Sequence, residues 1–327
     1  MATGGVHGLY VYRDAEPGAT ELSQDSPEYV LVYDIIDIAL GVLESEQGRT
    51  VLYELALAII QGVRNGGRRC LYPTTDRDFR DLPQYISMFL QKMRAGFPEV
   101  YIVPNKVEAT TLRDDWASGE STLRDFVPYD AGRLVLNSMI IDDMLANTNE
   151  NAHNVYMFDM VVSVSHELCH FFTGFLTGTA TPQTPDVVAI EGQSREAGFF
   201  FEFHAFGGIA DFFASESDPR NAHQPGVAYL FENVKNTARG KRISLEYIRQ
   251  FIASRGAIGL PIGLSNSGSW TTRNDLKRRT RQMNVLRNQE FTAMQQQGRL
   301  GSGSAASSSA TRHRLLQPNY DQYGYEY

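Results

Sequence analysis

The stretch Ser165-His166-Glu167-Leu168-Cys169-His170 constrains this chain more than any other part of it. It reads H-E-x-x-H and lies in an apolar run that extends from about Val155 to Gly178. Residues four apart on a helix lie one turn above each other, so His166 and His170 can present two imidazole nitrogens to one metal ion. The run therefore predicts a buried central helix that carries two metal ligands.

Two neutral imidazoles, a third ligand and one open position suit Zn²⁺, which lowers the pKa of its bound water to about 7. Glu167 lies at the edge of the same helix face, where its carboxylate can take a proton from that water. The alternative is two core histidines satisfied by hydrogen bonds beside a solvated glutamate. Burying these three side chains in an apolar helix is costly without compensation, which favours the metal site.

These residues resemble the zincins, zinc metallopeptidases built around an H-E-x-x-H helix, and the resemblance extends to about Gly208. Metzincins carry Gly and His three and six residues after the second histidine, where this chain has Thr173 and Leu176. Aspzincins continue with G-T-x-D, but the run Gly178–Thr181 ends in threonine, and Asp186 is a weak substitute. Gluzincins take a glutamate from a second helix further downstream. That branch fits best.

The gluzincin pattern implies a third metal ligand after the motif helix, and Glu196 is the residue we expect in that role. It begins an aromatic helix expected over 199–213, and on a helix it shares one face with Phe200 and Phe203. The small residues Ala197 and Gly198 beside it allow another helix to approach closely. Alternatively, Glu196 only complements the dipole of its helix. The other ligands left open are Asp186, Glu191, Glu202 and His204.

Many gluzincins also place an aspartate four residues after the ligand glutamate, where it orients a histidine. Phe200 occupies that position here, so the carboxylate has to come from elsewhere in the chain. Asp159, seven residues before His166, is one candidate. A donor for the oxyanion of the reaction is also expected. The sequence leaves four candidates for it, namely His204, His223, Tyr229 and Tyr247.

Composition bounds the remaining possibilities. The chain has 327 residues, of which 42% are hydrophobic, and is therefore globular. Its net charge of −8 argues against nucleic acid as a partner. Two cysteines, Cys70 and Cys169, make a disulfide framework improbable, and the first residues lack a secretory signal, so we expect a cytoplasmic protein. The long apolar run carries Asp159 and the motif, so we expect no membrane partner.

The predicted fold class is α+β and mostly helical. It is zincin-like, with a small mixed sheet packed on the H-E-x-x-H helix and a C-terminal helical subdomain. The expected divisions are a loose leader over 1–27, a catalytic unit over 28–270, a basic polar helix over 271–298 and a low-complexity, disordered tail over 299–327. Within the catalytic unit, 28–178 holds the sheet and the motif helix, and 179–270 is a helical part with the third ligand.

Hydrophobic periodicity predicts the individual elements. Helices are expected at 29–46, 50–64, 82–93, 139–145, 242–254 and 275–297, and strands at 9–12, 69–72, 99–103 and 133–137. In zincins, the edge strand of the sheet lies along the substrate cleft, where an extended peptide can pair with it. Arg133–Asn137 has the right place in the chain order for that strand. An interior strand without a ligand is the alternative.

The expected function is a zinc-dependent peptidase, in which Glu167 activates a zinc-bound water against the amide carbonyl of a peptide or peptide-like substrate. One alternative is a metal enzyme of another class, such as a cyclase, a hydratase or a non-haem iron oxidase. Others are an inactive zincin-like binding protein and a helical scaffold with an accidental motif. The sequence leaves the oligomeric state open.

Overall fold

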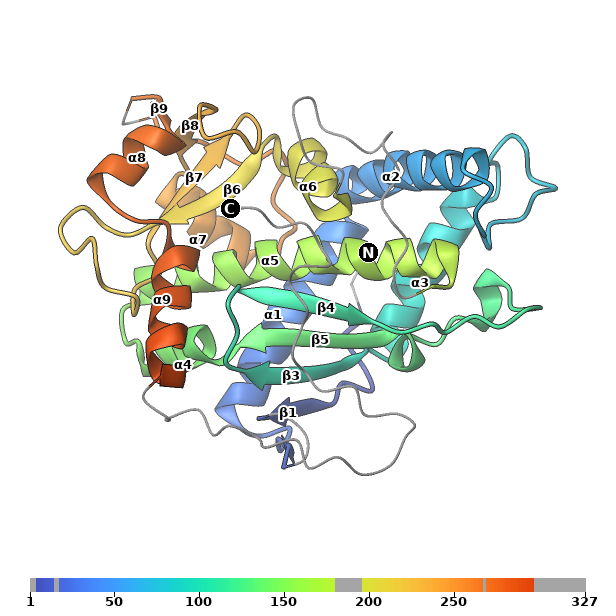
Figure 1. The fold of residues 1–327 in the computed structure, drawn as a ribbon, viewed down its shortest axis with the longest axis horizontal. Coiled ribbons are helices and arrows are strands. Elements are labelled where there is room, and N and C mark those ends of the chain that lie inside the picture. Colours follow the sequence, from blue (N-terminus) through green and yellow to red (C-terminus); the bar gives the residue numbers. More distant parts are fainter. Residues whose placement is uncertain (1–3, 15–17, 180–195, 267–268, 297–327) are drawn as a thin grey trace.

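The computed structural model describes residues 4–14, 18–179, 196–266 and 269–296. Helices and two small sheets make up an α+β fold, as predicted (Figure 1). The motif helix α5 (Glu150–Thr177) runs between the two sheets and contacts both of them. The first sheet is built from the first half of the chain and the second sheet from residues 209–272.

Three helices predicted by periodicity are present in the first half, namely α1 (Pro27–Glu44), α2 (Glu46–Asn65) and α3 (Leu82–Ala95). Ser26 begins α1 by accepting a hydrogen bond from the backbone N–H of Tyr29. Ser45 ends α1 and also begins α2, because its hydroxyl oxygen accepts from the N–H of Gly48 at 2.9 Å. One serine therefore makes the sharp junction between two buried helices.

The first sheet has the strand order β2-β1-β3-β5-β4. Its strands are β1 (Val11–Arg13), β2 (Thr20–Glu21), β3 (Glu99–Val103), β4 (Ala109–Arg113) and β5 (Gly132–Asn137). β1, β3 and β5 are parallel, while β2 and β4 are antiparallel to their neighbours at the two edges. Two short 3₁₀ turns, η1 (Leu123–Asp125) and η2 (Pro128–Asp130), lie before β5.

The structure bears on three expectations for this half. The loose leader expected over 1–27 includes the predicted strand 9–12, of which Val11 and Tyr12 lie in β1, and it also holds β2. Of the two roles left open for Arg133–Asn137, the structure shows the interior strand, as part of β5, and the edge beside α5 is β4, which was not predicted. The predicted strand over 69–72 is absent. The backbone N–H of Leu71 instead donates to the carbonyl of Leu176 at 2.9 Å, near the end of α5.

The motif helix follows the short helix α4 (Ser138–Ala146) and is unusually well buried. From Val155 to Thr177, every residue is buried except Ser163 and His170. The helix ends at Gly178, whose φ of 73° is a left-handed conformation that glycine adopts without strain. Despite its length, neither this nor any other described helix is apolar enough to cross a membrane.

The prediction of a C-terminal helical subdomain is wrong for the part of the chain after residue 196. That part holds a four-stranded antiparallel sheet of β6 (Ile209–Phe213), β7 (Val227–Phe231), β8 (Arg239–Arg242) and β9 (Thr271–Thr272). The helices here are α6 (Ala197–Phe201), the π-helical turn η4 (Glu202–Phe206), α7 (Leu245–Ala253), α8 (Arg273–Arg279) and α9 (Met283–Gln296).

The aromatic helix predicted over 199–213 therefore stops early. Gly207, with a φ of 83°, ends η4, and the chain continues as β6. The basic helix expected over 271–298 is two helices, broken at Thr280, whose hydroxyl donates to the carbonyl of Ala214 at 2.7 Å. The tail predicted over 299–327 lies outside the described residues.

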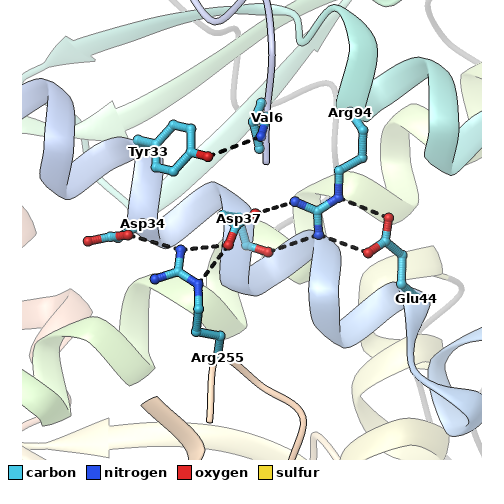
Figure 2. Close-up of polar contacts among 7 residues, drawn as sticks. All are labelled: Val6, Tyr33, Asp34, Asp37, Glu44, Arg94 and Arg255. Atoms are coloured by element: carbon cyan, nitrogen blue, oxygen red, sulfur yellow. Dashed lines mark hydrogen bonds and ion pairs between the residues drawn. The ribbon is translucent and has the colours of Figure 1, made fainter. Parts of the chain in front are cut away.

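A network of ion pairs, buried at Asp37 and Arg94, joins α1 and α3 to the segment after α7 (Figure 2). Asp37 of α1 accepts hydrogen bonds from Arg94 of α3 and from Arg255, which follows α7. Arg94 also holds Glu44 through two hydrogen bonds of 2.9 and 2.8 Å, and Arg255 reaches Asp34 at 2.9 Å. The carboxylate of Asp37 is thus the point at which α1, α3 and the segment after α7 meet.

We expect Arg94→Met to lower the free energy of unfolding by about 3 kcal/mol, because it leaves the buried carboxylates short of a partner. Urea unfolding followed by circular dichroism measures the change. The matched control is Arg80→Met, since the Arg80–Asp78 pair is largely exposed and its loss should not be measurable. Equal unfolding free energies for the two variants would show that the network contributes little.

Candidate metal centre

The structure brings together the three side chains predicted as metal ligands. His166 and His170 lie one turn apart on α5, and Glu196 lies at the N-terminus of α6. One donor atom from each lies within 4.8 Å of the other two. The Nε2 atom of His166 is 3.0 Å from Oε2 of Glu196, and the Nε2 atom of His170 is 2.5 Å from Oε1. Among the described residues, this is the one group of three or more potential metal ligands that lie so close together.

One donor atom of this group lacks a hydrogen-bond partner among the described residues. The Nε2 atom of His170 is buried, and within the described part of the chain it makes no hydrogen bond, although Glu196 lies so close. A divalent cation held between these atoms would satisfy both of them, and two imidazoles with a carboxylate suit Zn²⁺ among other ions.

The position of Glu196 is compatible with both of the roles considered for it. Besides facing the histidines, its carboxylate caps α6, because Oε1 accepts from the N–H of Gly198 at 3.1 Å and Oε2 from that of Phe199 at 2.8 Å. These two hydrogen bonds fix the direction of the carboxylate. The capping role therefore does not exclude the role of a metal ligand.

Gly198 is required by the close packing of α6 on α5. A Cβ atom at this position would lie 2.2 Å from the Cδ2 atom of His166, which no side chain tolerates. The glycine thus permits the N-terminus of α6 to lie directly against the imidazole ring. Phe199 packs its ring edge-on to the same imidazole, with 4.9 Å between the centroids. The first turn of α6 is therefore shaped around His166.

The electrostatics of the group are strongly coupled. Burial alone would raise the pKa of Glu196, but the two imidazoles hold it well below its usual range. Burial alone would lower the pKa of His166, but Glu196 and Glu202 together raise it well above its usual value. Without a metal, the raised pKa favours the imidazolium form of His166, in which both ring nitrogens carry a proton. A cation that binds at Nε2 has to displace the proton of that nitrogen.

Glu202 supplies the supporting carboxylate that sequence analysis could not place. Its Oε1 atom is 2.7 Å from Nδ1 of His166, and its Oε2 atom accepts from the N–H of Ala210 at 3.2 Å. A carboxylate on Nδ1 directs the Nε2 lone pair of His166 toward the site. The candidate for this role, Asp159, instead pairs with Arg287 at 3.0 Å. Glu202 had been considered only as a direct ligand.

The expected general base, Glu167, is buried next to the ligands and contacts the edge strand. Its Oε2 atom accepts from the backbone N–H of Thr111 at 2.7 Å, and the Thr111 hydroxyl donates to the Glu167 carbonyl at 3.1 Å. Thr111 thus fastens β4 to α5 and fixes the direction of the carboxylate. No signal in the sequence indicated Thr111, because its strand was not predicted.

The remaining candidates have their contacts elsewhere. The ring of His204 packs at an angle on Phe200, and His223 pairs with Asp143 at 2.8 Å. Tyr229 packs on Phe213 and Phe231 in the second sheet, and Tyr247 packs on Phe251 of its own helix. None of these contacts involves the metal group, so no oxyanion donor is assigned. Asp186 and Glu191 lie outside the described residues.

No protein-family model, curated protein or solved structure matches this chain. Its function has to be inferred from the site itself.

We expect the protein to bind one divalent ion through these ligands. Zinc at about a hundred times its dissociation constant should stabilise the fold by about 2.7 kcal/mol, and thermal unfolding with and without zinc measures this. His170→Gln should abolish the stabilisation because it removes a ligand. The control His223→Gln changes a half-exposed histidine away from the site and should keep it. Undiminished stabilisation of the His170→Gln protein would contradict the assignment.

A second test uses the glycine at the contact between α5 and α6. Gly198→Ala places a methyl group against the His166 ring, so we expect a loss of about 1–3 kcal/mol of stability together with impaired zinc binding. Gly119→Ala is the matched control, since no heavy atom lies within 4 Å of its Cβ position. Zinc titration monitored by calorimetry compares the two. If both variants bind zinc like the unaltered protein, α6 does not pack as described.

Proposed function

We propose that this protein is a zinc-dependent peptidase of the gluzincin type, in which His166, His170 and Glu196 hold Zn²⁺ and Glu167 is the general base. The observation that carries the proposal is the convergence of three donor atoms within 4.8 Å of one another, with Glu167 next to His166 on the same helix. The side chains of His170 and Glu196 are 15% and 18% exposed, so solvent reaches the rim of the group even though Nε2 of His170 is itself buried.

Zinc, when bound, acidifies a water molecule and polarises the carbonyl group of the substrate. The protein's own groups do the rest. Glu167 accepts a proton from the attacking water and can pass it to the leaving amine. The N–H of Thr111 holds one oxygen of Glu167, so this carboxylate needs little reorganisation during the reaction. Glu202 keeps a proton on Nδ1 of His166, which leaves Nε2 free as a ligand.

The position of β4 supports a peptide as the substrate. The carbonyl of Glu108 and the N–H of Asp114 bond toward β5 and its flank. Backbone groups alternate along a strand, so those of Ala109 and Thr111 point to the opposite edge, where the N–H of Thr111 is held by Glu167. An extended peptide that adds along this edge therefore lies directly beside the carboxylate of Glu167. The zincin resemblance implies an edge strand along the cleft, and we assign that role to β4 rather than to β5.

A second candidate function follows from the ligand set. Two histidines and one carboxylate also describe the ligand triad of non-haem iron enzymes. A redox iron site has no need of a general base, however. The buried carboxylate of Glu167, oriented beside the metal ligands by a backbone N–H, therefore favours hydrolysis.

We expect Glu167→Gln to bind zinc normally and to lose about 10²–10⁴-fold in peptide hydrolysis, since the amide cannot accept a proton. Cleavage of a mixed peptide library, followed by mass spectrometry, measures the rate. Glu54→Gln, on the exposed face of α2, is the matched control.

Two results would contradict the proposal. Equal rates for the Glu167→Gln and unaltered proteins would reject Glu167 as the base. A zinc-loaded protein that cleaves no peptide would instead fit an inactive binding protein.

A further inference from the structure

Arg287 of α9 is a buried cation with unused hydrogen-bonding capacity. Its side chain is 1% exposed, and its Nη1 atom donates to Asp159 at 3.0 Å and to Glu108 at 3.1 Å. Its Nε and Nη2 atoms are also buried, but they meet no acceptor among the described residues. Buried donors of a charged group are rarely left without an acceptor, so these two indicate a ligand.

The position of Arg287 relates it to the metal centre. Residues 159, 163, 166 and 170 form one stripe along α5, and Asp159 precedes His166 by two turns, or about 10.5 Å. Ser163, between them, is partly exposed within an otherwise buried stretch. Solvent therefore reaches this face of α5 between the metal ligands and Arg287.

Arg287 also marks one end of the edge strand. Glu108, its second partner, immediately precedes β4, whose Thr111 contacts Glu167. Figure 1 shows α9 crossing the first turns of α5, near the end at which β4 begins. A peptide laid along β4 and over Ser163 consequently meets α9 and its arginine on that side of the metal.

The free nitrogens of Arg287 have the geometry that a carboxylate recognises. Nε and Nη2 lie on the same side of the planar guanidinium and donate two parallel hydrogen bonds, which fit the two oxygens of a carboxylate. Glu108, at 20% exposure, is the partner that can yield to admit a ligand. Burial raises the pKa of Asp159 to about 7 although Arg287 opposes this, so Asp159 can be neutral when a further carboxylate binds.

We propose that Arg287 binds a carboxylate of the substrate, and that in a peptide this is the C-terminal carboxylate. This inference rests on the proposed peptidase function and specifies its substrate. An extended chain advances about 3.3 Å per residue, so a separation of about 10.5 Å corresponds to about three residues beyond the cleaved bond. The enzyme then removes short segments from the C-terminus of peptides and does not cut long chains internally.

The test measures cleavage of three matched peptides by the unaltered, zinc-loaded protein. The first peptide ends in a free carboxylate, the second in an amide, and the third in a glutamate whose own C-terminus is an amide. We expect amidation to lower kcat/KM by about 10–100-fold, mainly through KM, because it removes a charged acceptor. If the glutamate peptide recovers the kcat/KM lost on amidation, a side-chain carboxylate can be the ligand of Arg287. If it does not, the ligand is the C-terminal carboxylate. Equal values for all three peptides would overturn the proposal.

A variant locates the effect at Arg287. Arg287→Met should reduce the ratio of acid to amide kcat/KM to about one, whereas Arg281→Met, at an exposed position of the same segment, should leave the ratio unchanged. An unchanged ratio in Arg287→Met would place the carboxylate elsewhere. Should that variant not fold, the peptide comparison still decides. If no peptide is cleaved at all, the proposed peptidase function is rejected. If the acid and the amide are cleaved at equal rates, only the carboxylate site at Arg287 is rejected.

Discussion

The cost of burying charge beside α5 governs the rest of this structure. Glu196 and two imidazoles lie together in a largely apolar interior, and each needs the others to offset lost hydration. That requirement accounts for the hydrogen bonds around them: the N-terminus of α6 holds Glu196, Glu202 holds His166, and the edge strand holds Glu167. The group is thus arranged from three separate segments, with the motif helix at its centre.

The core of this group could be predicted because it depends on local spacing. A separation of four residues places His166 and His170 on one helix face in any helix. The role of Glu196 could be predicted only through the zincin resemblance. The role of Glu202 as the supporting carboxylate could not be predicted, because the gluzincin spacing of four residues after the ligand assumes that Glu196 already lies within the helix. Glu196 in fact caps the helix with an extended backbone, and the supporting carboxylate falls six residues later.

The fold was predictable where apolar periodicity was long, as in α1, α2, α3 and α5, and not where elements were short. The sequence Ala-Thr-Thr-Leu-Arg of β4 has too little alternation to stand out, and β4 becomes a strand by pairing with β5. The run Phe199–Phe213 is apolar enough for either a helix or a strand. Two adjacent glycines divide it, and Gly208 leaves room for the carbonyl of Phe231, so β6 can pair with β7.

The separation of the ligands along the chain has a consequence for folding cooperativity. His170 and Glu196 are 26 residues apart, at the end of the first half and the start of the second. An ion bound to both closes that loop as a covalent cross-link does, and it restricts the unfolded chain most when the loop is long. A metal bound at this site would therefore link two halves of the chain that are otherwise joined by ion pairs and packing, and would couple their unfolding.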